Sequence, residues 1–156
     1  MKVNASFVIL ATAALAVVSA QTGPFTSFAD CVTSPTQLTT TSFSLAPVPM
    51  CIAKPYCLTT TGTLSTAIIA GAKLAILGKY LQRVVYIDNR DLCTVLAANG
   101  TPCPVAAGPI TLNMCINVKP NFWPNVPTNF QFQAVNGDGN ILFCKAGKIP
   151  SFALNL

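Results

Sequence analysis

The chain has 156 residues, of which 52% are hydrophobic and only 8% are charged, and its net charge is +5. A charged fraction far below the usual level of about a quarter leaves an apolar excess, which a large core, a cavity or a partner must cover. The positive charges are scattered, so they give weak support for an anionic lipid surface. They argue against nucleic acid, which needs a clustered basic patch.

The first twenty residues have the pattern of an export signal. Lys2 gives a positive start, an apolar stretch runs from Phe7 to Val18, and Ser19 and Ala20 are small residues suited to a cleavage site. A stretch of this length is too short to cross a bilayer. We therefore expect a signal peptide at 1–20 and one mature domain at 21–156.

Several catalytic chemistries are excluded by composition. The chain has no His, and its four acidic residues are all Asp. This removes a Ser-His-Asp triad, a His-assisted cysteine nucleophile, a Glu acid–base pair and zinc sites with His ligands. Asp88 and Asp91 leave a paired-carboxylate hydrolase open as an alternative. The sequence favours a protein that is not an enzyme and has no cofactor or metal.

The mature chain is divided by Pro and Gly at short intervals, with β-branched and aromatic residues between them, which is typical of an all-β sandwich or barrel. Asp91 and Gly100 suit the two ends of a short helix over 94–98, and residues 136–140 suit a hairpin turn. The predicted strands cover 39–45, 57–64, 70–80, 83–87, 110–119, 130–134 and 141–146. About seven strands this closely spaced predict two packed antiparallel sheets.

Apolar side chains alternate along these strands and form stripes that face inward. Such stripes either fill a core or line a cavity, and alternation alone does not separate the two. The candidate wall residues are Phe43, Leu64, Leu74, Ile76, Tyr80, Val85, Val105, Ile110, Leu112, Met114, Ile116, Phe130, Phe132 and Phe143.

The proline-rich loop 120–127 carries Phe122 and Trp123. An aromatic pair held between prolines suits the mouth of a cavity resting in a membrane interface, and it equally suits a loop folded over the core. Three basic residues are candidates for a phosphate head group or for a solvated strand face: Lys79, Arg83 and Lys119. Asn99 begins a glycosylation sequon that Pro102 weakens.

Several features occur in a fixed order along the mature chain. After Cys31 come Cys51 and Cys57, then GAKLAILGKYLQRVVYIDNRDLC, CPVAAG, a long alternating strand, a proline-rich loop and GDGNILFCKAGKIP. Together these features resemble the ML lipid-recognition domain family, whose members include the Niemann–Pick sterol-transfer protein and fungal phosphatidylglycerol/phosphatidylinositol transfer proteins.

The resemblance implies an immunoglobulin-like β-sandwich that admits a sterol or phospholipid between its sheets. It also implies transient contact with a membrane surface, a monomer, and an extracellular or a vacuolar/lysosomal location. The alternative is a secreted immunoglobulin-like recognition module with a filled core.

Seven cysteines in an exported chain predict disulfides. Six cysteines allow about 15 connectivities, so spacing does not choose among them. The family resemblance suggests three pairs, Cys31–Cys144, Cys51–Cys57 and Cys93–Cys103. The first would tie the first strand to the last, for about 4–5 kcal/mol on a chain-entropy estimate. Cys115 is then left over, as a thiol, an alternative disulfide partner or a handle for an intermolecular bond.

Overall fold

The computed structural model describes residues 23–120, 126–149 and 152–153. The predicted signal peptide and the loop residues Phe122 and Trp123 lie outside the described residues.

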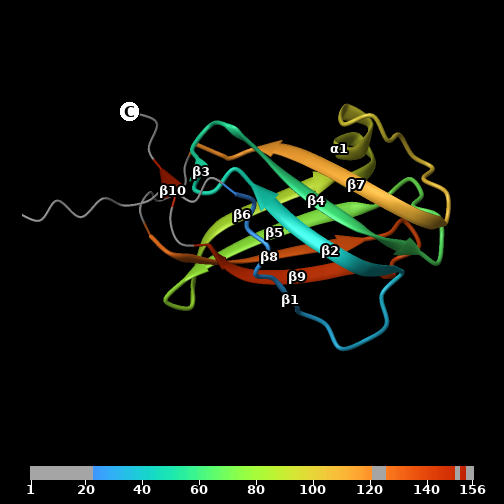
Figure 1. Cartoon of the computed structure of the whole chain (residues 1–156), viewed down its shortest axis with the longest axis horizontal. Helices are drawn as coiled ribbons and strands as arrows, with labels where there is room; N and C mark the ends of the chain where they lie inside the picture. The colour runs from blue at the N-terminus through green and yellow to red at the C-terminus, as the bar shows by residue number, and fades with distance from the viewer. Residues whose placement is uncertain (1–22, 121–125, 150–151, 154–156) are drawn as a thin grey trace, which may run out of the picture.

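Two antiparallel sheets face each other as the layers of a sandwich (Figure 1). The five-stranded sheet has the order β1 (Ala29–Asp30), β9 (Ile141–Ile149), β8 (Thr128–Val135), β5 (Lys73–Tyr80) and β6 (Arg83–Asp91). The three-stranded sheet has the order β2 (Leu38–Ala46), β4 (Pro55–Leu64) and β7 (Gly108–Asn117). A short parallel pair joins β3 (Met50–Cys51) to β10 (Phe152–Ala153). The predicted all-β sandwich is confirmed.

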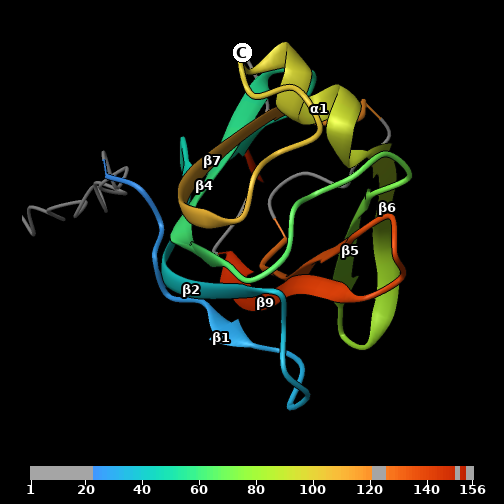
Figure 2. The same cartoon turned by 90° about the vertical axis from the view of Figure 1, so that its right-hand side faces the viewer.

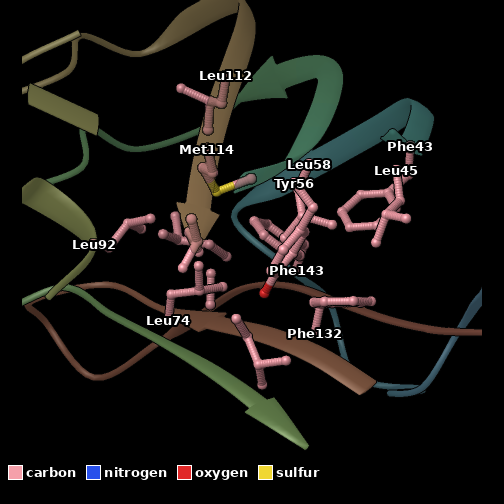
Figure 3. Packing of buried hydrophobic residues seen from close by; sticks show 14 of the residues in the cluster. Phe43, Leu45, Tyr56, Leu58, Leu74, Leu92, Leu112, Met114, Phe132 and Phe143 are labelled. Atoms are coloured by element: carbon pink, nitrogen blue, oxygen red, sulfur yellow. The ribbon is translucent and has the colours of Figure 1, made fainter. Parts of the chain in front are cut away.

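The core forms because alternate side chains of both sheets point into the space between them (Figure 3). In β7, for example, Leu112, Met114 and Ile116 are buried while Thr111 and Asn113 are exposed. A period of two places every apolar side chain of such a strand on one face. The alternation read from the sequence therefore gives the correct orientation here.

One alternating stripe is interrupted by a β-bulge. The register of β2 against β4 shifts between Thr40 and Ser42, so Phe43 is buried while Thr39 and Thr41 face solvent. An extra residue at a bulge turns the following side chains to the other face. The alternation predicted along 39–45 is therefore broken at this bulge.

The short helix α1 (Leu92–Ala98) begins two residues earlier than predicted. The Asp91 carboxylate accepts a hydrogen bond of 2.7 Å from the backbone N–H of Thr94, as the predicted cap requires. Gly100 follows with a φ of +86°, which suits glycine at a helix end. Leu92 and Leu96 are fully buried, so α1 closes one end of the sandwich.

Two of the three disulfides suggested by the resemblance are confirmed, Cys31–Cys144 and Cys93–Cys103. The third is wrong, because Cys57 is bonded to Cys115 and Cys51 is a free thiol. Cys57 and Cys115 lie directly opposite each other on β4 and β7, with their Cα atoms 4.0 Å apart. This register joins residues that are distant in the sequence, and the pairing of Cys51 with Cys57 that the family resemblance suggested does not hold in this chain.

Candidate lipid-binding site

Most of the predicted wall residues meet in the space between the two sheets. Tyr80, Val85 and Ile110 are only partly buried. Phe122 and Trp123 are not among the described residues. The buried members of the predicted set are Phe43, Leu64, Leu74, Ile76, Val105, Leu112, Met114, Ile116, Phe130, Phe132 and Phe143.

Strand β4 contributes more to this interior than its sequence suggested. The strand is rich in threonine, yet Tyr56, Leu58 and Thr60 are all buried. The signal that identifies them is their alternation with Cys57 and Thr59, which are half-buried on the other face. In an antiparallel sheet that packs one face on the core, every second residue of the central strand is buried.

Aromatic rings from both sheets fill the β2–β9 side of the interior. The Phe43 ring of β2 lies 5.7 Å from the Phe143 ring and 6.1 Å from the Phe132 ring, measured between centroids. Phe28 packs edge-on against Phe43 at 4.9 Å. Side chains of the two sheets thus contact each other directly, and a hydrocarbon chain enters this space only if the sheets move apart.

A buried polar cluster lies on the inner face of the edge strand β6. The Asp88 side chain is 1% exposed and accepts two hydrogen bonds from Arg90, at 2.9 Å from Nε and 2.8 Å from Nη2. Lys119, just beyond β7 of the other sheet, places its Nζ 3.0 Å from the Asp88 carboxylate. The Tyr86 hydroxyl donates to the same carboxylate at 3.4 Å. The carboxylate therefore has partners from both sheets.

The protonation states of this cluster follow from burial and pairing. Burial raises the pKa of Tyr86 to about 12, and burial also raises the pKa of Tyr56 well above its usual value. The hydrogen bonds to Asp88 raise the pKa of Arg90. Both phenols are therefore neutral and Arg90 is charged across the physiological pH range.

The β5–β6 hairpin presents apolar side chains to solvent at its tip. Leu81 and Gln82 form the turn with φ values of 46° and 64°. The Leu81 residue is 76% exposed and Val84 is 51% exposed. A hollow of about 570 Å³ lies beside this tip, lined by Tyr80, Leu81, Arg83, Val84 and Val85. The hairpin therefore combines an apolar tip with a basic flank.

The described carboxylates have separate roles. Asp88 is buried and ion-paired, whereas Asp91 is exposed and caps α1, so they do not form an acid–base pair. Asp138 accepts a hydrogen bond from the backbone of Asn140 in the β8–β9 turn, and Asp30 pairs with Lys145. No group of three metal-binding side chains occurs in the part of the chain that the structure describes.

In the described residues, no helix has the length and apolarity needed to cross a membrane.

Two facing antiparallel sheets around a large apolar interior define an immunoglobulin-like β-sandwich. The family model for the ML domain matches residues 26–150, and the chain belongs to this family. The family resemblance inferred from the sequence is confirmed.

A search of solved structures finds a similar fold in a Niemann-Pick type C2 protein from the Japanese carpenter ant. The two share 13% sequence identity with a TM-score of 0.60, and the match covers 82% of this chain and 98% of that chain. An identity this low shows a shared fold alone. A search of curated proteins finds no significant match.

Proposed function

We propose that this protein is a secreted carrier that holds a sterol or a phospholipid between its two sheets and exchanges it with membranes. The observation that carries the proposal is the buried apolar interior of an ML domain, whose walls come from both sheets. No bond is made or broken in this function, which agrees with the separate structural roles of the aspartates.

Burial of a hydrocarbon chain supplies enough free energy for such a carrier. Each buried methylene contributes about 0.8 kcal/mol, so a chain of roughly sixteen carbons gives on the order of 12 kcal/mol. Association and ordering oppose binding by roughly 4 kcal/mol or more. Separating packed side chains opposes it further. A dissociation constant in the micromolar range is sufficient for a protein that must also release its lipid.

Export is part of the same proposal. The predicted N-terminal signal sequence and the three disulfides fit a protein that folds in the secretory pathway and acts outside the cell or in a vacuolar or lysosomal lumen. The absence of His from the chain argues against a histidine pH switch for loading.

Met114 is the position that tests the binding site. It is fully buried on β7 and belongs to the apolar core between the two sheets (Figure 3). We expect Met114→Arg to abolish uptake of a fluorescent sterol or phospholipid from vesicles, because an unpaired charge is costly between the sheets. Asn113→Arg is the matched control, since Asn113 is exposed on the opposite face of the same strand.

A Met114→Arg protein with a native circular dichroism spectrum and normal lipid uptake contradicts the site. Because that variant is at risk of not folding, the wild-type protein provides a second measurement. Native mass spectrometry, before and after solvent extraction, is expected to show a co-purified or added lipid of defined mass.

A second candidate function is favoured by the packed aromatic contacts at the β2–β9 side. A sandwich with a filled core would serve as a recognition module for a protein or glycan. A clean ligand-free mass, together with no lipid uptake from vesicles, would support this alternative and remove the carrier.

The exposed hairpin is the part of the carrier that we assign to membrane contact. Leu81 and Val84 suit the membrane interface, and the nearby Lys79 and Arg83 suit anionic head groups. We expect Leu81→Glu to weaken co-sedimentation with phosphatidylcholine/phosphatidylglycerol vesicles without lowering thermal stability. Thr39→Glu, exposed on the other sheet, serves as the control. Equal sedimentation of both variants with the wild type argues against this assignment.

A further inference from the structure

The two sides of the sandwich are joined in different ways. On one side, the N-terminal segment crosses from sheet to sheet: Phe25 exchanges two backbone hydrogen bonds with Leu45 of β2, and Ala29 then pairs with Ala146 of β9. The backbone N–H of Gln37 also donates to the carbonyl of Ile141 at 2.9 Å. Backbone hydrogen bonds therefore fix the β2–β9 side.

Among the residues that the structure describes, the opposite side has no such ladder. β6 and β7 are edge strands of different sheets and do not pair with each other. Figure 2 shows the two layers close together at β2 and β9 and further apart at β7 and β6, where α1 spans one end. The Cys93–Cys103 disulfide and the bridge between Ile68 and Val105 fix the α1 end. Among the described residues, neither a disulfide nor a backbone hydrogen bond between β6 and β7 crosses the remaining corner, which lies between the hairpin end of β6 and the end of β7.

Neither of the other two disulfides crosses this corner. Cys57–Cys115 joins β4 to β7 within the three-stranded sheet, and Cys31–Cys144 lies within the five-stranded layer. Movement of β6 away from β7 leaves both bonds intact.

Lys119 supplies the polar connection across this corner. Its Nζ lies 3.0 Å from the Asp88 carboxylate and donates to the Ile87 carbonyl at 3.0 Å. Its backbone N–H donates to the Tyr86 hydroxyl at 3.4 Å. All three partners are on β6, whereas Lys119 follows the edge strand of the other sheet.

These contacts are suited to reversible opening. Arg90 and Tyr86 are on the same strand as Asp88, so they move with it and keep the carboxylate hydrogen-bonded after Lys119 leaves. The Lys119 side chain is already 40% exposed, so water readily replaces its lost partners. A buried carboxylate left without a partner would make opening very costly. Opening at this edge avoids that cost, because the carboxylate keeps its partners on β6.

We propose that the sandwich opens between β6 and β7, and that the Asp88–Lys119 ion pair is the latch that holds this edge closed. The inference rests on the proposed lipid carrier, because the packed interior requires the sheets to part before a lipid enters. Lys119 then acts as a positioning residue that sets the rate of lipid exchange rather than the identity of the lipid.

The test compares Lys119→Met, which removes the charge and keeps most of the stem, with Lys119→Arg, which keeps the charge. Transfer of dehydroergosterol and of a pyrene-labelled phosphatidylcholine between vesicles is measured for each. We expect Lys119→Met to exchange both lipids about two- to fivefold faster, which is the scale of a partly exposed ion pair, and Lys119→Arg to remain close to the wild type. Lys73→Met, at an exposed lysine on the outer face of β5, is the matched control.

Hydrogen exchange of the lipid-free protein gives a readout that needs no lipid. We expect Lys119→Met to speed exchange in peptides covering 84–90 and 112–119, and to leave β2 and β9 unchanged. If the wild type takes up neither lipid, the proposed carrier fails and the latch is judged from hydrogen exchange alone. The latch is overturned if Lys119→Met has the same lipid-transfer and hydrogen-exchange rates as Lys119→Arg and Lys73→Met. It is also overturned if hydrogen exchange in Lys119→Met is faster evenly over all strands.

Discussion

At the scale of single residues, Phe132 is the centre of the aromatic packing. Its ring stacks on Phe130 at 5.8 Å and lies 5.9 Å from Phe28 and 6.1 Å from Phe43. It is fully buried, and its neighbours come from both sheets. A side chain in this position stabilises each layer against the other, so its removal affects the whole sandwich.

We expect Phe132→Ala to lower the free energy of unfolding by about 3–5 kcal/mol, because the substitution removes buried apolar area and leaves a cavity. Urea denaturation followed by circular dichroism measures the change. Asn129→Ala, on the outer face of the same strand, is expected to stay within about 0.5 kcal/mol of the wild type. Equal losses in the two variants would show that Phe132 does not bridge the sheets.

At the scale of structural elements, the β4–β7 pairing decides the cysteine chemistry. The two strands align from Pro55 opposite Asn117 to Leu64 opposite Gly108, and this register brings Cys57 to Cys115. Cys51 lies on β3, which pairs with a different part of the chain. The free thiol of the described structure is therefore Cys51.

Peptide mapping without reduction is expected to recover Cys57 linked to Cys115 and Cys51 in the alkylated form. The double variant Cys57→Ala/Cys115→Ala is expected to lose about 4 kcal/mol of stability on a chain-entropy estimate for this loop, and Cys51→Ser is expected to lose little. Recovery of a peptide linking Cys51 to Cys57 would contradict this connectivity.

At the scale of the whole molecule, the sandwich is fixed on one side and open to movement on the other. A lipid that enters between the sheets binds only the folded protein, so it stabilises the fold by mass action. The same lipid replaces contacts between side chains of the two layers. The net change in the free energy of unfolding is the difference between the contacts that the lipid makes and the side-chain contacts that it replaces.

We expect the thermal midpoint to rise when the protein is loaded with a bound sterol or phospholipid. At a free lipid concentration of one hundred times the Kd, the gain is about 2.7 kcal/mol. Differential scanning calorimetry of lipid-extracted and reloaded protein measures it, and Met114→Arg provides the unloaded control. A midpoint that does not change on loading argues against binding between the sheets.

The sequence alone determined the all-β class, the inward stripes and the helix cap. Each of these depends on local periodicity or on a short-range hydrogen bond, such as the one from the Asp91 carboxylate to Thr94. The bulge at Thr40 escaped it because a bulge depends on the register with the partner strand. The need for glycine at position 78 also depends on the partner strand, because a Cβ there would lie 2.9 Å from the Tyr86 Cβ of the neighbouring strand.

Only the tertiary structure decided which distant residues meet. The Cys57–Cys115 bond and the Asp88–Lys119 ion pair join segments that are far apart in the sequence. Strand order also decided which edges of the sandwich are tied and which are free to part. Strand pairing and layer packing are collective properties of the chain, so no local pattern of residues specifies them.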